Sequence, residues 1–264
     1  MIKSSFILSM LLLVGCISMA QSYNNPESIV YDQTADRYFI SNKAGNTIVY
    51  LDSEHELTTF VSSGLDAPKG LLIAGDTLIS VNNTSVQGFL LSDGRRVFNV
   101  LIRDAVFMND VTADKKGNLY VSDSAVGKVY QISLKTGEYS TLINSLVGPN
   151  GLLYDSKRDA ILICNWGANA KIQYYKLSDS TLSNMVTTEL SNLDGLASDN
   201  AGNIYVSSWG SKAVYKFDSS FKNSPVVISE GHNGPADIFI IKDKNRLCIP
   251  NFNSNSIQFV ELKY

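Results

Sequence analysis

The sequence is poor in several residue types on which common classes of protein depend. Its 264 residues include only three cysteines and two histidines, and no run of basic residues marks a nucleic-acid-binding surface. The formal net charge of −3 and the pI of about 5.4 also argue against a polyanionic partner. Beyond the N-terminal segment, no stretch shows sustained helical periodicity. The composition therefore disfavours nucleic-acid binding and a helical fold.

The scarcity of cysteine also limits covalent cross-linking. Cys16 lies in the N-terminal segment, so only Cys164 and Cys248 would remain after removal of a soluble-type signal. These two residues fall in different internal repeats, at unlike positions, whereas a disulfide requires Cα atoms within roughly 7 Å of each other. We expect two buried free thiols.

The N-terminal segment resembles an export signal, with Lys3 followed by an apolar run at 6–15 that is too short to span a bilayer comfortably. Two processing routes are open. The SMA pattern before Gln21 predicts a signal peptide over residues 1–20 and release into the periplasm. The LVGC pattern instead resembles a lipobox and predicts a signal over residues 1–15, with Cys16 lipidated and the protein anchored to a membrane. An uncleaved anchor is the third alternative.

The abundant residue types, which are Tyr, Val, Ile, Ser, Asn and Gly, favour strands and turns, and they recur in a repeating pattern. Six segments open on a similar motif, and successive segments start 40 to 44 residues apart, which is the period of a four-stranded propeller blade. The motifs are PESIVYD at Pro26, PKGLLIA at Pro68, MNDVTAD at Met108, PNGLLYD at Pro149, LDGLASD at Leu193 and PADIFII at Pro235.

Each segment contains four strand-like stretches separated by turn residues. In the third segment these stretches are DVTAD, LYVSDS, VGKVYQISL and YSTLI, and the first and last turns are KKGN and KTGE. Four strands in each of six segments predict an all-β fold, namely a single six-bladed β-propeller over residues 24–264. The last segment has sequence for only three strands. A short fourth strand from the residues before Pro26 would close the ring.

The second residue of each opening motif is expected at one mouth of the central channel, because the first strand of a propeller blade lines that channel. These residues, called the inner ring below, are Glu27, Lys69, Asn109, Asn150, Asp194 and Ala236. Asn-Gly and Asp-Gly are also common turn pairs, so tight turns before the strands are an alternative interpretation. Turn chemistry would not require Glu27.

A second aligned set of polar residues ends the second strand of each blade and is expected at the same mouth. This outer ring consists of Asn42, Asn82, Asp123, Asn165, Ser208 and Asn251. Trp166, Trp209 and Phe252 follow it directly in three neighbouring blades and would wall one side of a pocket. Asp123, Asn165, Trp166 and Trp209 are therefore candidate substrate-binding residues.

Four members of the inner ring carry oxygen atoms suited to a metal ion. Glu27, Asn109, Asn150 and Asp194 offer two carboxylates and two amide oxygens from four blades, a set that suits Ca²⁺ or another divalent cation such as Mg²⁺ or Mn²⁺. The ring contains no histidine or cysteine, which argues against zinc. His55 and His232 lie outside the aligned positions and are interpreted as surface or loop histidines. The metal would be catalytic or a structural plug of the channel.

With these motifs the chain resembles the family of senescence marker protein (regucalcin), gluconolactonase and luciferin-regenerating enzyme, over all six segments. The resemblance implies a divalent metal held by Glu27 of PESIVYD, Asn109 of MNDVTAD, Asn150 of PNGLLYD and Asp194 of LDGLASD. It also implies that Asp194 is a general base. The chain differs from the sugar lactonases at Phe107, where they usually carry a substrate-gripping arginine, and in ESI where they have EGP.

The aligned residues and the family resemblance suggest two possible functions. The first is a metal-dependent lactonase or esterase acting on a small molecule, in which Asp194 is the base and Lys69 stabilises an oxyanion or binds an anionic group. Asp237 would orient Lys69, and Phe107 would make the pocket more apolar than a sugar-acid site. The alternative is a non-catalytic binding propeller with a structural metal. In that case Lys69 would be a surface lysine over the rim and Asp237 a turn residue.

Overall fold

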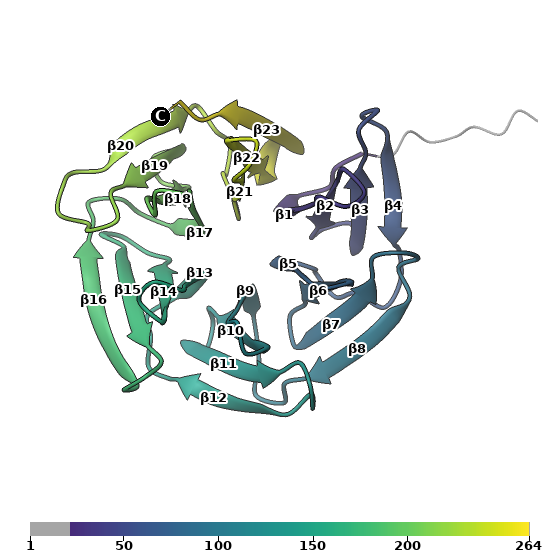
Figure 1. The fold of residues 1–264 in the computed structure, drawn as a ribbon, viewed down its shortest axis with the longest axis horizontal. Helices are drawn as coiled ribbons and strands as arrows, with labels where there is room; N and C mark the ends of the chain where they lie inside the picture. Colours follow the sequence, from purple (N-terminus) through teal and green to yellow (C-terminus); the bar gives the residue numbers. More distant parts are fainter. Residues whose placement is uncertain (1–21, 264) are drawn as a thin grey trace, which may run out of the picture.

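Six antiparallel sheets are arranged radially around a central channel, as Figure 1 shows. The computed structural model describes residues 22–263. Five sheets have four strands and the sixth has three, and in every sheet the first strand lies innermost and the others follow outward in chain order. The predicted six-bladed β-propeller is therefore confirmed.

The strands of the first three blades follow the repeat found in the sequence. The first blade consists of β1 (Pro26–Asp32), β2 (Arg37–Asn42), β3 (Thr47–Leu51) and β4 (Leu57–Val61), the second of β5 (Leu71–Ala74), β6 (Thr77–Val81), β7 (Ser85–Leu90) and β8 (Arg96–Leu101), and the third of β9 (Met108–Ala113), β10 (Asn118–Asp123), β11 (Lys128–Ser133) and β12 (Tyr139–Ile143).

The last three blades repeat this order. The fourth blade consists of β13 (Pro149–Asp155), β14 (Ala160–Asn165), β15 (Lys171–Lys176) and β16 (Thr181–Thr187), the fifth of β17 (Leu193–Ser198), β18 (Ile204–Ser208), β19 (Ala213–Phe217) and β20 (Val226–Glu230), and the sixth of β21 (Phe239–Ile241), β22 (Arg246–Asn251) and β23 (Ser256–Glu261), with the short 3-10 helix η1 (Phe252–Ser254) between its last two strands.

The hydrophobic core is divided among the six interfaces between neighbouring blades. Six clusters of buried side chains are present in the described residues, and each joins one pair of adjacent sheets. In β10, Leu119 and Val121 pack against the second blade, while Tyr120 between them packs against the fourth. Successive side chains of a strand point to opposite faces. Because both faces of each sheet are covered, second strands such as β14, with the sequence AILICN, are largely apolar along most of their length.

The ring closes between the first and sixth blades without the expected fourth strand. Residues 22–25 form no strand, and the sixth sheet has three strands within the described residues. Main-chain contacts join the two blades near the channel, where the Asp237 N–H donates to the Glu27 carbonyl oxygen at 2.9 Å. The prediction that residues directly before Pro26 supply a strand is therefore wrong for residues 22–25.

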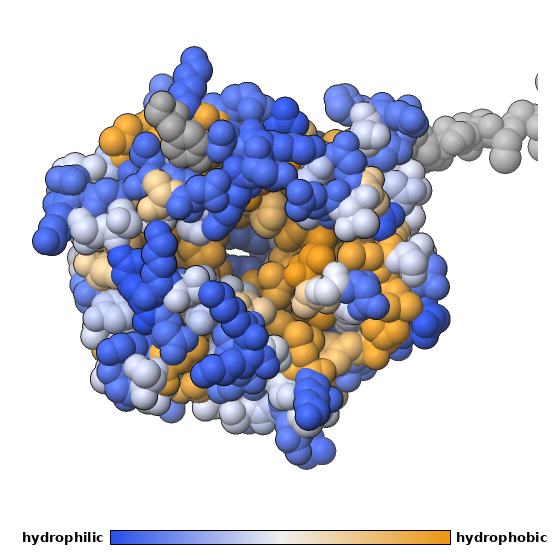
Figure 2. Space-filling view, in the orientation of Figure 1, coloured by the Kyte–Doolittle hydropathy of each residue, from blue (hydrophilic) through white to orange (hydrophobic). Residues whose placement is uncertain are grey.

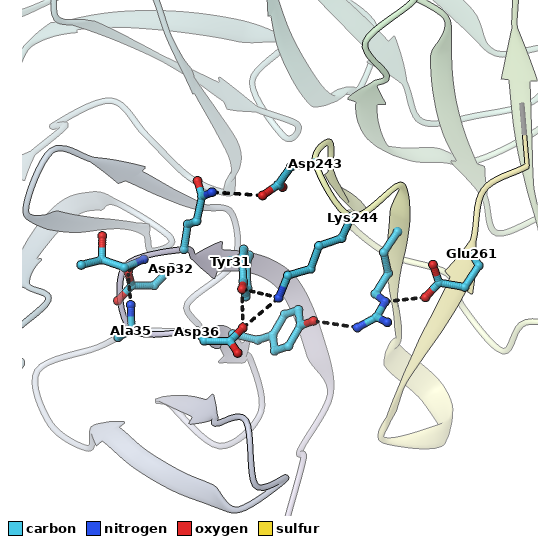
Figure 3. A network of polar contacts seen from close by, with 11 residues as sticks. Tyr31, Asp32, Ala35, Asp36, Asp243, Lys244 and Glu261 are labelled. Atoms are coloured by element: carbon cyan, nitrogen blue, oxygen red, sulfur yellow. Dashed lines mark hydrogen bonds and ion pairs between the residues drawn. The ribbon is translucent and has the colours of Figure 1, made fainter.

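Polar side chains complete this closure further from the axis (Figure 3). Lys244 from the β21–β22 turn donates to Asp36 in the β1–β2 turn at 2.9 Å, and Gln33 donates to Asp243 at 3.0 Å. Arg246 of β22 reaches the Tyr38 hydroxyl at 3.4 Å. The contacts are mostly exposed, so the buried contacts nearer the channel dominate the stability of this junction.

The sequence predictions outside the strands have mixed outcomes. Cys164 and Cys248 are both buried free thiols, as expected. Within residues 22–263, no helix is long and apolar enough to cross a membrane. The signal peptide, its cleavage site and the lipidation of Cys16 lie outside the described residues.

Candidate active site

The six inner-ring residues come together around the channel as the alignment predicts. Four of them lie near the start of the inner strands β1, β9, β13 and β17, whereas Lys69 lies two residues before β5 and Ala236 three residues before β21. All six are buried. Four polar side chains of the ring line one cavity, and these are Glu27, Asn109, Asn150 and Asp194. The repeat therefore predicted correctly which residues converge.

The backbone of the inner ring is fixed by hydrogen bonds between neighbouring blades. In five of the six positions the ring carbonyl accepts a hydrogen bond from the preceding blade. The pairs are Asp237 N–H to Glu27, Gly70 N–H to Asn109 at 2.9 Å, Ser122 Oγ to Asn150 at 2.7 Å, Cys164 Sγ to Asp194 at 2.9 Å, and Ser207 Oγ to Ala236 at 2.7 Å. Because the carbonyls are occupied, the side chains are the groups that the ring presents to the channel.

The glycine after the ring residue is required by this close approach and not by a turn. A Cβ at Gly151 would lie 2.0 Å from the Asp194 carbonyl oxygen, and one at Gly195 would lie 2.4 Å from the Ile238 nitrogen. Neither glycine has a positive φ, and the Asn150–Gly151 pair lies inside β13. The alternative interpretation of this pair as a tight turn is therefore wrong. At these two positions a side chain would collide with the neighbouring inner strand, so glycine is required there.

The cavity at the channel mouth has a volume of about 360 Å³. Its wall combines the four polar ring residues with aromatic side chains and one lysine, and consists of Glu27, Lys43, Phe107, Asn109, Ser124, Gly148, Asn150, Trp166, Asp194, Trp209 and Phe252. Figure 2 shows the disc hollowed at its centre, with hydrophobic surface beside a narrow opening. The cavity is large enough for a small organic molecule.

An arc of aromatic rings forms the outer wall of the cavity. The ring centroids of Trp166 and Trp209 are 5.5 Å apart at 69°, and those of Trp209 and Phe252 are 5.4 Å apart at 49°. The Lys43 ammonium lies 5.2 Å from the Phe252 centroid and 5.0 Å from the Phe107 centroid. Phe107, Trp166 and Trp209 therefore lie where the sequence predicted, on the wall of the pocket.

The two carboxylates of the ring are held in an unfavourable environment for negative charge. Burial, followed by repulsion from Asp194, raises the pKa of Glu27 well above its ordinary value, and Lys69 and Lys43 oppose this shift. Burial raises the pKa of Asp194 to about 7, against the opposing influence of Trp209. Two buried like charges in one cavity favour binding of a cation or a proton.

Two oxygen atoms of the ring have no hydrogen-bond partner although they are buried. They are Oε2 of Glu27 and Oδ1 of Asn150, while the Asn150 amide nitrogen donates to the Leu193 carbonyl oxygen at 3.1 Å. The Asn150 side chain is thereby oriented with its oxygen unpaired. A buried acceptor without a partner is costly, so its presence indicates a ligand that satisfies it.

These residues fit a hard divalent cation. Carboxylate and amide oxygens are the ligands that Ca²⁺ prefers, and Glu27, Asn109, Asn150 and Asp194 supply four of them on one cavity wall. No cluster of three or more His, Cys, Asp or Glu side chains suited to a metal is found in residues 22–263. The ring contains only two acidic residues, and its other two candidate ligands are amides.

Lys69 lies outside the cavity wall and its ammonium is already bound. It donates to the Ala67 carbonyl oxygen at 3.0 Å and to Asn83 Oδ1 at 2.9 Å, and it lies 4.6 Å from the centre of the Phe107 ring. Desolvation lowers its pKa to about 8, although the Glu27 carboxylate raises it. The geometry therefore supports neither the oxyanion role nor a surface lysine at the rim. Lys69 instead packs behind Phe107.

Asp237 does not orient Lys69 as predicted. Its Oδ2 accepts a hydrogen bond from the Ser28 hydroxyl at 2.5 Å, and the Ser28 Oγ in turn accepts one from the Leu71 N–H at 3.1 Å. Asp237 is buried and does not line the cavity. Asp237, a candidate substrate-binding residue from the sequence, instead makes a structural contact between the sixth, first and second blades.

The outer-ring residues hold loops and do not line the pocket. Asp123 accepts hydrogen bonds from the Val106 and Phe107 N–H groups at 2.8 and 3.1 Å, and Asn165 donates to the Val147 carbonyl oxygen at 2.7 Å. Each fixes the loop that leads into the inner strand of its own blade. The prediction that Asp123 and Asn165 bind substrate is not supported, although Asp123 positions the cavity residue Phe107.

Lys43, Ser124 and Gly148 line the cavity but were not predicted. Lys43 and Ser124 follow the outer ring in their blades, at the same repeat position as Trp166, Trp209 and Phe252. Asn83 occupies this position in the second blade and holds Lys69. Considering all six residues at this repeat position, and not only the aromatic ones, would have identified Lys43 and Ser124 as candidates. Gly148 precedes the inner-ring motif and leaves no comparable signal.

The histidines take no part in the cavity. His55 is exposed, but His232 is buried, with its ring nitrogens 3.0 Å from Asn251 Oδ1 and 2.9 Å from Ser229 Oγ. The interpretation of His232 as a loop residue is right, but it is not at the surface. Burial lowers its pKa, which keeps the ring neutral near pH 7.

A second hollow of about 450 Å³ lies among turns that include Asp155–Arg158 and Asp199–Gly202. Three of its charged side chains have local partners, since Arg158 forms an ion pair with Asp155 and Lys242 donates to Ser198 at 3.2 Å. No unpaired buried polar atom of residues 22–263 lies on its wall. The cavity at the ring is therefore the better candidate for a ligand site.

A family model described as SMP-30/Gluconolactonase/LRE-like region matches residues 25–249. This match spans all six inner-ring positions and ends within β22 of the sixth blade. No curated protein matches the chain significantly by sequence.

Several solved structures share the fold at low sequence identity. A gluconolactonase from Xanthomonas campestris is 13% identical, with a TM-score of 0.78 over 92% of this chain and 87% of that one. Virginiamycin B lyase from Staphylococcus aureus is 13% identical, with a TM-score of 0.68 over 90% and 85%. A chain of a nidogen–laminin complex is 16% identical, with a TM-score of 0.75 over 86% and 89%. At these identities the likeness shows the fold alone.

Proposed function

Because the chain belongs to the SMP-30/gluconolactonase/LRE-like family, we propose that it is a divalent-metal-dependent hydrolase of the lactonase or esterase type. The site would be the cavity at the channel mouth, and the substrate a small organic molecule. Family membership supports the general chemistry, and the composition of the cavity supports its location.

One observation carries the proposal. The unpaired buried oxygens of Glu27 and Asn150 lie on the same cavity wall as Asp194 and Asn109, and both carboxylates are held with raised pKa values. A rigid arrangement of this kind costs stability unless a ligand satisfies it. Functional sites commonly hold such unfavourable groups.

Glu27, Asn109, Asn150 and Asp194 would hold the metal, with Ca²⁺ as the leading candidate and Mg²⁺ or Mn²⁺ as alternatives. When bound, a divalent cation supplies Lewis-acid polarisation of a carbonyl oxygen. The four residues come from different blades, and the hydrogen bonds between blades fix their backbones, so the set is preorganised.

Asp194 is the proposed general base. Its carboxylate faces the cavity, where it would accept a proton from an attacking water. The aromatic arc would exclude bulk water from the substrate. Lys69 has no direct catalytic part in this scheme, since its ammonium is occupied elsewhere.

The proposal is tested by hydrolysis of a panel of lactones and aryl esters, with and without chelator, by the wild type and Asp194→Ala. We expect activity that is lost on chelation, restored by Ca²⁺, and reduced at least about a hundredfold by the substitution. Glu54→Gln is the control, because Glu54 is exposed in the β3–β4 turn. Activity that survives both chelation and Asp194→Ala would overturn the proposal.

A non-catalytic binding propeller remains the second candidate function. The aromatic arc favours it, because Trp166 is 39% exposed and the rings offer a ready surface for a glycan or metabolite. If no substrate in the panel turns over while Ca²⁺ still raises the melting temperature, the binding function replaces the hydrolase. The metal would then be structural.

We also propose that the protein is exported, either to the periplasm or to a membrane through a lipid on Cys16. The support is the N-terminal sequence alone. Fractionation of cells that express the full chain and Cys16→Ala tests both routes. Retention of the full chain in the cytoplasm would refute export, and an unchanged distribution of Cys16→Ala would refute the lipid anchor.

A further inference from the structure

Lys43 is the one cationic side chain on the wall of the cavity within the described residues. It is half-buried, and its ammonium forms no hydrogen bond or ion pair with any residue in 22–263. The ammonium lies between the rings of Phe107 and Phe252, at 5.0 and 5.2 Å from their centroids. Lys69 nearby differs, because Ala67 and Asn83 bind its ammonium.

The charges on the cavity wall favour an anion once a divalent cation is bound. Glu27 and Asp194 carry two negative charges when ionised, and a divalent cation would balance both. Lys43 then leaves the wall with one positive charge. The unpaired ammonium would gain from a carboxylate, because charge-assisted hydrogen bonds are among the strongest available to a ligand.

The rest of the wall favours a flat apolar group. Trp166, Trp209 and Phe252 form a continuous arc beside the ring, and Lys43 stands at the Phe252 end of this arc. Aromatic faces bind planar rings through offset or edge-to-face contacts. The arc offers few polar groups for the several hydroxyls of a sugar acid.

We propose that the ligand of this cavity is a monoanionic compound with a planar apolar ring, and that Lys43 is the specificity-determining residue that binds its carboxylate. The inference rests on the proposed location of the site and names its substrate class. The ring of the ligand packs against the aromatic arc, while its carboxylate reaches the Lys43 ammonium.

Tryptophan fluorescence gives a direct test, because the chain has only two tryptophans and both line this cavity. Ca²⁺-loaded protein is titrated with phenylacetate, with its neutral analogue phenylacetamide, and with acetate. We expect phenylacetate to bind at least about tenfold more tightly than either. Removal of Ca²⁺ should lower the affinity for phenylacetate more than the affinity for phenylacetamide, because Glu27 and Asp194 then repel the anion.

The variants separate recognition from general stability. Lys43→Gln should bring the two phenyl ligands within about twofold of each other, whereas Lys43→Arg should keep the preference for the anion. Lys115→Gln is the matched control, because it removes one positive charge from the exposed β9–β10 turn. Equal wild-type affinities, no binding of either phenyl ligand, or an unchanged preference in Lys43→Gln would each overturn the inference.

The outcome is distinguishable from that of the proposed hydrolase. Binding of phenylacetate through Lys43 without turnover of any ester would support this inference and refute the hydrolase. Hydrolysis of phenyl acetate and 4-acetoxybenzoate with equal kcat/KM would refute this inference and leave the hydrolase standing.

Discussion

At the scale of single residues, the inner ring concentrates groups that are unfavourable in the absence of a ligand. Glu27 and Asp194 are buried like charges, and Asn150 is oriented so that its side-chain oxygen has no partner. Replacing a buried charge by a neutral residue of similar volume is often stabilising, whereas a ligand that needs the charge is then lost. Stability and metal binding should therefore respond in opposite directions to substitutions in the ring.

Glu27→Gln tests this trade-off. In chelator, we expect the variant to be more stable than the wild type by about 1 kcal/mol, because one of two repelling buried carboxylates is removed. The rise in melting temperature on addition of Ca²⁺ should largely disappear. Thermal unfolding with chelator and with Ca²⁺ measures both effects. A variant that is unaltered in chelator and keeps the full Ca²⁺ shift would contradict the ligand role of Glu27.

The raised pKa values predict a pH dependence of the metal-free protein. Burial raises the pKa of Asp194 and of Asp110 to about 7, so the folded state binds protons that the unfolded state has released. The stability from this difference is fully present below the unfolded pKa of 3.8 and is lost as the pH rises through about 7. The melting temperature in chelator should fall between pH 6.5 and 7.5.

The same measurement in saturating Ca²⁺ is the comparison, because a bound cation favours the ionised carboxylates. The fall in melting temperature that these carboxylates cause should then be smaller. His232 acts in the opposite direction, because burial lowers its folded pKa below 6.5 and stability then rises as the unfolded histidine loses its proton, but this contribution is the same with and without Ca²⁺. A melting temperature that rises with pH in chelator over the same interval would count against the raised pKa values.

At the scale of elements, neighbouring inner strands determine which residues fit beside the ring. Gly151 lies in the middle of β13, yet its φ is not positive, so the requirement for glycine comes from the adjacent blade. The Cys164 thiol, which donates to the Asp194 carbonyl oxygen, occupies the repeat position of Ser122 and Ser207. The third, fourth and fifth blades thus each use one small polar side chain to hold the next blade.

Gly151→Ala should be strongly destabilising. The added Cβ would lie 2.0 Å from the Asp194 carbonyl oxygen, so the two inner strands must separate. We expect a loss of about 3 kcal/mol in urea unfolding, at the upper end of the usual overpacking cost. Gly45→Ala is the matched control, because its φ is not positive and its Cβ would meet neighbours at 3.3 Å or more. Equal effects of the two substitutions would refute the close-approach explanation.

At the scale of the whole molecule, the ring is closed by buried contacts near the axis in place of a shared strand. Ser28 links three blades, because its hydroxyl donates to Asp237 of the sixth and accepts from the Leu71 N–H of the second. The exposed contacts of Lys244 lie at the periphery of the same junction (Figure 3). Closure is therefore expected to depend on the buried link.

Ser28→Ala should destabilise the protein by about 3 kcal/mol, because it leaves both the Asp237 carboxylate and the Leu71 N–H without that partner. Lys244→Ala removes only exposed contacts and should have a much smaller effect. Urea unfolding of the two variants compares them directly. A larger loss in Lys244→Ala than in Ser28→Ala would show that the peripheral contacts close the ring.

The number of blades and the identity of the inner-ring residues could be predicted from the amino-acid sequence. Both are encoded in a period of 40 to 44 residues, and a repeat places equivalent residues at equivalent heights around one axis. The sequence also predicted that Trp166 and Trp209 flank the pocket, because they share one position of that repeat.

The hydrogen-bond partner of each polar side chain could be identified only from the folded structure. Lys69 and Lys43 both lie near the mouth, but contacts from Ala67 and Asn83 bind the ammonium of the first and leave that of the second unpaired. Asp237 accepts a hydrogen bond from the Ser28 hydroxyl, and Asp123 accepts one from the N–H of Phe107 in the loop before β9. Hydrogen-bond partners from other blades settle these roles, and a repeat pattern specifies position along an axis but not which neighbour a flexible polar side chain meets.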